Sequence, residues 1–120
     1  MMKSIDDLTR TLRQFADERH WEQYHSPKNL VMALSVEAAE LVEHFQWLTQ
    51  QESQNLSADQ KRAVREEIAD VFIYLVRLAD RLDIDLLKAA EDKMALNALK
   101  YPAHGEQALE NGSPPKRDKS

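Results

Sequence analysis

The sequence predicts an all-α fold, a four-helix bundle built as one domain. The chain has 120 residues, of which 42% are hydrophobic and 31% charged, a balance that suits one globular core better than a disordered chain. It has only two glycines, Gly105 and Gly112, which leaves few glycine turns for a strand-rich fold. Apolar residues recur at helical spacing in four segments, so each segment is expected to form a helix.

The first two helices are predicted from their start signals. Ser4 is an N-cap candidate, and Ser26-Pro27 supplies a cap and a first-turn proline for the second helix. We expect the second helix to run to about Thr49, after the interruption HWEQYH. The first helix carries its apolar residues at helical period, at Ile5, Leu8, Leu12, Phe15 and Ala16.

The third and fourth helices follow a polar connector, QQESQNLS. Ser57 caps the third helix, which is predicted from 58 to about 82. An aspartate of the next turn, Asp83 or Asp85, caps the fourth helix. That helix is predicted from 86 to about 100, where a Tyr-Pro pair stops it.

Composition limits the setting and the partners. Residues 1–104 are expected to form the helical domain, and the polar stretch 105–120 a disordered C-terminal tail. No signal-peptide pattern opens the chain and no apolar run approaches the roughly 20 residues of a membrane span, so a cytoplasmic protein without a membrane partner is expected. The chain has no cysteine, which excludes disulfides and thiolate sites.

The net charge is −5, from 16 basic and 21 acidic residues. This balance argues against a broad surface for DNA or RNA, and we expect no nucleic acid polymer as a partner. A nucleotide remains possible, because a metal ion can bridge two anions.

Two carboxylates of the second helix are expected beside its core face. At about 100° per residue, Glu37 falls within the leucine stripe and Glu40 within the adjacent stripe. Glu43 points away and is expected to be solvated. His44 lies between the stripes and is interpreted as a packed, hydrogen-bonded histidine. The leucine stripe comprises Leu30, Leu34, Leu41 and Leu48; the adjacent one comprises Asn29, Val36 and Trp47.

The third and fourth helices add further polar groups. Glu67, Asp70 and Tyr74 flank the apolar stripe of the third helix, whereas Lys93 and Asn97 line the inner face of the fourth. At this position the lysine could bind an anion, and the asparagine could form hydrogen bonds with the polar edge of a ligand. The third helix's stripe is predicted to contain Val64, Ile68, Val71, Leu75 and Leu82.

Four carboxylates that converge from two helices repel one another unless cations lie between them. Oxygen ligands favour Mg²⁺ or Mn²⁺. The alternative is that these carboxylates pair with lysines and arginines elsewhere. A di-iron centre would need two helical E-x-x-H units, and only Glu22 to His25 has that spacing, just before Pro27.

The second helix is apolar on most of its circumference, more than one partner face requires. This excess predicts a homo-oligomer.

The ordered motifs EAAE, EEIAD and KMALNALKYP resemble those of the MazG-like all-α nucleoside triphosphate pyrophosphohydrolases. The stretches ERHWEQYHSPKNL, FQW and DVFIYLVRLAD are similar to the dCTP pyrophosphatase branch. The resemblance covers about residues 8 to 104. Lys100 stands where similar proteins often carry an arginine.

The resemblance implies a hydrolase of the nucleotide pyrophosphatase type. With Mg²⁺, it would convert a dNTP to dNMP and pyrophosphate, with dCTP or a modified dCTP as the preferred substrate. Its role would be house-cleaning of the nucleotide pool. The resemblance also implies a homotetramer arranged as a dimer of dimers. The matching metal ligands are Glu37, Glu40, Glu67 and Asp70. The matching substrate-binding residues are His25, Trp47, Tyr74, Lys93 and Asn97.

The expected roles follow from this set. Glu40 or Glu67 would position or deprotonate the attacking water, and Lys93 would offset charge on the departing pyrophosphate. Trp47 would stack on the base, since it follows Glu40 by two helical turns, about 10 Å. Two alternatives stay open: a non-catalytic sensor that binds Mg-nucleotide, and a helical interaction module without a ligand.

Overall fold

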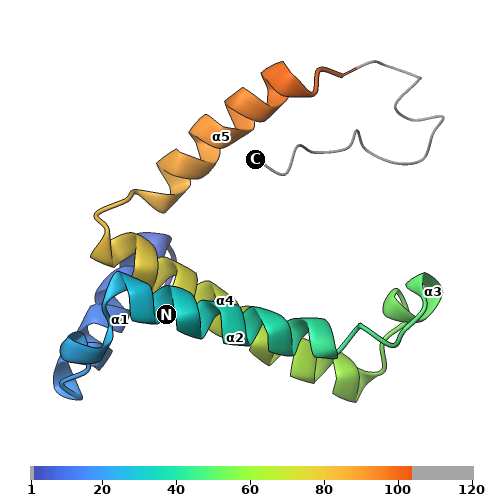
Figure 1. Cartoon of the computed structure of the whole chain (residues 1–120), viewed down its shortest axis with the longest axis horizontal. Helices are drawn as coiled ribbons and strands as arrows, with labels where there is room; N and C mark the ends of the chain where they lie inside the picture. Colours follow the sequence, from blue (N-terminus) through green and yellow to red (C-terminus); the bar gives the residue numbers. More distant parts are fainter. Residues whose placement is uncertain (1, 104–120) are drawn as a thin grey trace. The chain divides into compact units, whose positions relative to one another are not determined.

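A computed structural model describes residues 2–103, and within that range every regular element is a helix (Figure 1). The tail predicted for 105–120 lies outside the described residues. None of the described helices has the length and apolar character needed to cross a membrane. The elements are α1 (Ile5–Glu18), the 3₁₀ turn η1 (Glu22–Tyr24), α2 (Pro27–Glu43), α3 (Gln50–Ser53), α4 (Ala58–Arg81) and α5 (Leu86–Lys100).

The predicted helix starts are confirmed by their side-chain caps. The hydroxyl oxygens of Ser4, Ser26 and Ser57 each accept a hydrogen bond from the backbone N–H three residues later, at 3.0, 3.2 and 3.1 Å. Asp85 caps α5 in the same way, through Lys88 N at 3.1 Å. Asp83 does not cap the helix; its backbone has φ 56°, a left-handed conformation that aspartate tolerates after a helix end.

The predicted end of the second helix at Thr49 is wrong, because α2 ends at Glu43. Residues 44–47 form turns, and Thr49 is extended, with ψ 165°. Thr49 begins the short helix α3 with a capping box: its hydroxyl oxygen accepts from Glu52 N at 3.0 Å, and Glu52 Oε1 accepts from Thr49 N at 2.9 Å. The reciprocal cap starts a new helix where the apolar pattern alone suggested continuation.

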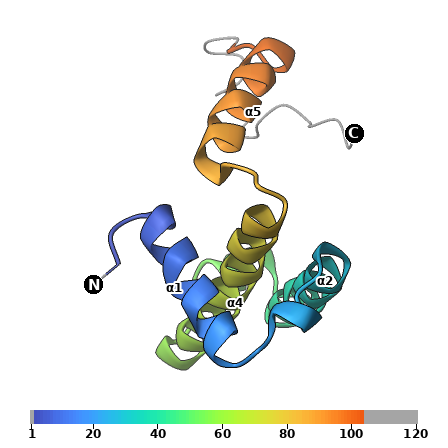
Figure 2. The same ribbon diagram turned by 90° about the vertical axis from the view of Figure 1, so that its left-hand side faces the viewer.

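The described residues divide into two units at the boundary between Ile84 and Asp85. In the first unit α1 and α2 both pack against α4, and Figure 2 shows them on either side of it. In the second unit the structure describes α5 by itself, so a bundle that includes this fourth long helix stays a prediction. The buried apolar core of the described residues consists of Ala16, Leu30, Val64, Val76 and Ala79.

The predicted apolar stripe of α4 is only partly buried. Val64 is buried, but Ile68, Leu75 and Leu82 are exposed, and the buried positions near the end of α4 are instead Val76, Arg77 and Ala79. Period alone identifies an apolar face, but whether that face is buried depends on how many helices cover it. In unit 1, α1 and α2 leave part of α4 uncovered.

Candidate functional site

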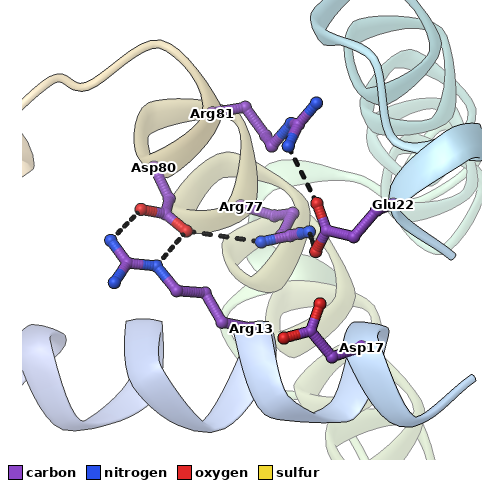
Figure 3. Close-up of a pocket in the computed structure, with 6 residues that line it drawn as sticks. All are labelled: Arg13, Asp17, Glu22, Arg77, Asp80 and Arg81. Carbon is purple, nitrogen blue, oxygen red and sulfur yellow. Dashed lines mark hydrogen bonds and ion pairs between the residues drawn. The ribbon is translucent and has the colours of Figure 1, made fainter. Parts of the chain in front are cut away.

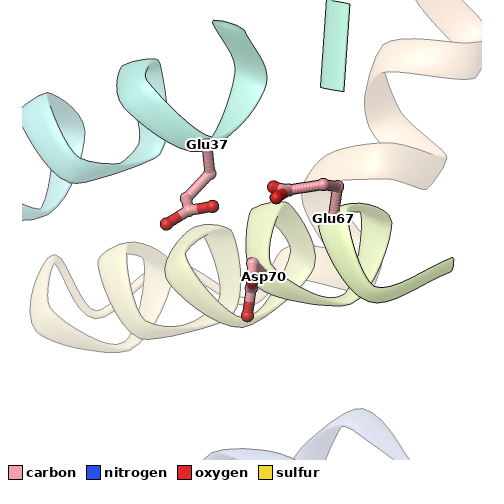
Figure 4. A group of neighbouring side chains, drawn as sticks. All are labelled: Glu37, Glu67 and Asp70. Atoms are coloured by element: carbon pink, nitrogen blue, oxygen red, sulfur yellow. The ribbon is translucent and has the colours of Figure 1, made fainter. Parts of the chain in front are cut away.

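Three carboxylates from two helices meet where α2 packs along α4. Glu37 of α2 and Glu67 and Asp70 of α4 each place one carboxylate oxygen within 4.8 Å of the others (Figure 4). Glu37 and Glu67 are half-buried and Asp70 is exposed. The convergence predicted from the E-x-x-E and E-x-x-D spacings is confirmed for these three residues.

Two oxygens of this carboxylate cluster have no protein partner. Glu37 Oε2 and Glu67 Oε2 are buried, and neither makes a hydrogen bond to any group in residues 2–103. Burial, followed by the neighbouring carboxylates of Glu67, Glu40 and Asp70, raises the pKa of Glu37 to about 7. Unpartnered carboxylate oxygens are costly to bury. Carboxylate oxygens that lie within 4.8 Å of one another fit a divalent cation such as Mg²⁺.

Glu40 adjoins the carboxylate cluster without belonging to it. It lies one turn after Glu37 on α2, is half-buried, and is close enough to contribute to the raised pKa of Glu37. Its role as a fourth ligand or as a proton acceptor stays a prediction.

The other predicted site residues are distributed along the chain. Tyr74 is half-buried one turn beyond Asp70 on α4. Trp47 is 86% exposed in the turn after α2, so its predicted place on a continuous helical stripe with Glu40 is wrong. Lys93 is exposed and Asn97 half-buried, one turn apart on α5 in the second unit, and their approach to the carboxylates stays a prediction. His44, expected to be packed, is half-buried.

His25 belongs to a charged network that the sequence did not reveal. Arg77, only 3% exposed, donates from Nε to His25 Nδ1 at 3.3 Å, and its other nitrogens bind Glu22 and Asp80. Two more arginines complete this arginine network, which Figure 3 shows: Arg81 donates to Glu22 at 2.8 Å, and Arg13 Nε donates to Asp80 at 2.8 Å.

The network also explains why EQYH is not half of a metal centre. The carboxylate of Glu22 is already bound by Arg77 and Arg81. In the sequence Arg77 follows Asp70 by seven residues, which places both on one face of α4 but does not indicate that Arg77 binds His25 or Glu22.

Asp80 stabilises this part of the fold in a pH-dependent way. The hydrogen bond from Arg13, followed by the positive charges of Arg13, Arg77 and Arg81, holds the pKa of Asp80 below its usual value, although burial acts in the opposite direction. Since the folded pKa is lower than the unfolded one, the stabilisation is present above about pH 4 and is lost as the pH falls through the folded pKa.

We predict that Asp80→Asn lowers the unfolding free energy by about 1–3 kcal/mol at pH 7, because it removes one of the negative charges that balance the buried guanidinium of Arg77. Thermal melts should show the difference from wild type shrinking towards pH 3. Asp59→Asn is the matched control, since Asp59 pairs with Arg62 on the same helix at an exposed position and should change stability by less than about 1 kcal/mol. A wild-type melt for Asp80→Asn at pH 7 would contradict the assignment.

Comparisons with known proteins identify the family to which the sequence is similar. The model of the MazG-like family matches residues 32–113, a range that contains the whole carboxylate cluster. The chain is 47% identical over 103 residues to dCTP pyrophosphatase 1 of Homo sapiens and 44% identical to that of Rattus norvegicus, covering 84% of this chain. It spans about 61% of the length of these curated relatives.

A solved structure extends the likeness to the fold. A pyrophosphatase from Archaeoglobus fulgidus is 42% identical and superposes with a TM-score of 0.79, covering 86% of this chain and 96% of that one. The match covers nearly all of that chain, and the family model includes α4 and the part of α2 that carries Glu37. The chain therefore belongs to the MazG-like family.

Proposed function

We propose that this protein is a Mg²⁺-dependent nucleoside triphosphate pyrophosphohydrolase that converts a dNTP to dNMP and pyrophosphate. The observation that carries the proposal is the cluster of Glu37, Glu67 and Asp70 with two buried, unpartnered oxygens. The names of its relatives, dCTP pyrophosphatases, support dCTP or a modified dCTP as the preferred substrate. Removal of such nucleotides from the pool would be a house-cleaning role.

The clustered carboxylates would hold Mg²⁺, or Mn²⁺ in its place. When bound, the ion would offset the charge of the triphosphate and polarise the scissile phosphoryl group. Glu37, Glu67 and Asp70 supply the convergent oxygens, and Glu40 is next to them on α2. No lysine or arginine forms an ion pair with these three carboxylates in the described part of the chain. This favours a metal role over pairing within the protein.

Other side chains are proposed to supply the remaining chemistry. Water attacks the α-phosphorus, the bond to the bridging oxygen breaks, and pyrophosphate leaves. Glu40 or Glu67 orients the water and accepts its proton. Lys93 balances charge on the leaving pyrophosphate, and Asn97 contacts the phosphates or the sugar. Tyr74 lines the substrate pocket beside the carboxylates.

His25 is proposed to contact the base of a nucleotide bound at the carboxylate cluster of its own chain. Trp47 lies beyond the other end of α2, so it is proposed to stack on the base bound by another copy in the homo-oligomer. Arg77, which binds His25, lies two turns along α4 from Asp70, about 10 Å away on the same face. A nucleotide with its phosphates at the carboxylate cluster has about this length. The exposed indole of Trp47 has a face free for stacking in the described unit.

Trp47→Ala is expected to raise KM for every nucleotide about tenfold, because stacking contributes about 1–3 kcal/mol without regard to base identity. The helices should stay intact, since the indole is 86% exposed. Steady-state kinetics with dCTP, dTTP and dATP measure the effect. An unchanged KM for all three would remove Trp47 from the binding site.

A pyrophosphate-release assay across dCTP, dTTP, dUTP and dATP tests the proposed function. We expect nucleotide turnover that depends on Mg²⁺, with dCTP as the preferred substrate. Binding of Mg-nucleotide without turnover would indicate a sensor. Neither binding nor turnover would indicate a helical interaction module. Equal kcat/KM for all four nucleotides would refute the base preference but would still support the proposed hydrolase activity.

We further predict a homotetramer, arranged as a dimer of dimers. The support is apolar surface left exposed on two helices that would otherwise form a core. Light scattering at working concentration should give about four times the 13.9 kDa chain mass. A monomer would contradict the prediction. The exposed residues include Val31, Met32, Val36 and Val42 on α2, and Ile68, Phe72 and Leu75 on α4.

A further inference from the structure

A buried arginine determines which ring nitrogen of His25 carries the proton. Arg77 Nε lies 3.3 Å from His25 Nδ1. A guanidinium N–H can only donate, so Nδ1 must accept. The neutral imidazole then carries its single hydrogen on Nε2.

The orientation of Arg77 is itself fixed. One terminal nitrogen binds Glu22, and the other binds Asp80 Oδ2 at 3.3 Å. Arg81 also binds Glu22, and Arg13 also binds Asp80, so each carboxylate has two arginine partners (Figure 3). With both terminal nitrogens engaged, the Nε–H keeps its direction towards His25.

The surroundings of His25 favour its neutral ring. Burial first, then the positive charge of Arg77, lower the pKa of His25; Glu22 acts in the opposite direction, and Arg81 lowers the pKa further. The ring also lies 5.7 Å from that of Trp21. Nε2 has no hydrogen-bond partner among residues 2–103, so its N–H is free for a ligand.

We propose that Arg77 is a positioning residue that presents His25 as an Nε2–H donor to N3 of the substrate's cytosine. This inference rests on the proposed function. Cytosine N3 is an unprotonated hydrogen-bond acceptor. N3 of thymine and uracil carries a hydrogen, so it would place its own N–H against the Nε2–H of His25, and no hydrogen bond could form. A histidine held in the other tautomer would present an acceptor and reverse the preference.

The tautomer can be measured in the full chain without any nucleotide. A long-range ¹H–¹⁵N spectrum should show His25 protonated at Nε2 alone. Arg77→Met should give a mixture of tautomers or the Nδ1–H form. In this variant Glu22 keeps Arg81 and Asp80 keeps Arg13, so neither carboxylate loses all its partners. Arg81→Met is the matched control, because it also removes one arginine from Glu22 without touching His25, and should leave the tautomer unchanged.

The second measurement is the ratio of kcat/KM for dCTP to that for dTTP. His25→Ala and Arg77→Met should each lower it about 3- to 10-fold, the range expected for one hydrogen bond, and the double variant should lower it no further. Arg81→Met should keep the wild-type ratio. A dCTP analogue with carbon in place of N3 should lose the same factor in the wild-type protein, a comparison that needs no variant to fold.

Three results would overturn the inference: His25 protonated at Nδ1 in the wild type, an unchanged tautomer in Arg77→Met, or equal losses of dCTP and dTTP turnover in that variant. If the chain turned over no nucleotide, the proposed function would fail, and the tautomer spectrum would still decide whether Arg77 positions His25.

Discussion

Glu67→Gln is expected to lower kcat/KM for dCTP at least about 100-fold while the helices remain folded. The amide keeps the shape of the side chain but removes the negative charge. It also replaces one of the carboxylate oxygens that point to a shared position with those of Glu37 and Asp70. Glu67 Oε2 has no partner within the described residues, so the substitution breaks no hydrogen bond of that oxygen. Circular dichroism should therefore match the wild type.

Glu66→Gln is the matched control. Glu66 is the preceding residue on α4 and is exposed. It should retain wild-type activity. Glu40→Gln should also fold and lose most activity. Wild-type turnover by Glu67→Gln would exclude Glu67 from the chemistry, and an unfolded variant would assign it a structural role instead.

Glu37→Gln is expected to stabilise the protein in chelator while destroying its activity. At pH 8 the wild-type carboxylate is ionised, above its pKa of about 7, in a crowded and partly buried position. The ionised form costs stability because the folded pKa lies above the unfolded one. A neutral amide removes that cost, and we expect a gain of about 1 kcal/mol or more, seen as a rise of several degrees in Tm.

Mg²⁺ should reverse the order of the Tm values of the wild type and Glu37→Gln. Added Mg²⁺ is expected to raise the Tm of the wild type, because it binds the folded state, and to raise that of Glu37→Gln less. Glu43→Gln, at an exposed position on the same helix, should behave as the wild type under both conditions. A lower Tm for Glu37→Gln in chelator would show that this carboxylate stabilises the fold by itself.

The features that the sequence predicted correctly depend on local chemistry. Ser26 followed by Pro27 specifies a helix start with no reference to the rest of the chain, and so does Ser57. The three carboxylates were predictable because helical period places them on facing sides of α2 and α4. The end of α2 was missed although the capping box that starts α3, Thr49 to Glu52, stands in the sequence. The apolar residues before it suggested continuation more strongly.

Other features depend on tertiary structure. Arg77 binds residues 52 and 55 positions away, so no local pattern could pair it with His25 or Glu22. The stripe of Ile68 and Leu75 was recognisable as apolar, but its burial depends on a partner that unit 1 does not supply. Lys93 and Asn97 are four residues apart and share a face of α5, as their spacing predicted.

The central claim is that the clustered carboxylates support pyrophosphate release from a nucleoside triphosphate. Product analysis by ³¹P NMR, with dCTP and the full chain, tests it most directly. We expect dCMP and pyrophosphate in Mg²⁺, and no turnover in excess chelator. Release of dCDP and phosphate, or undiminished turnover in chelator, would contradict it.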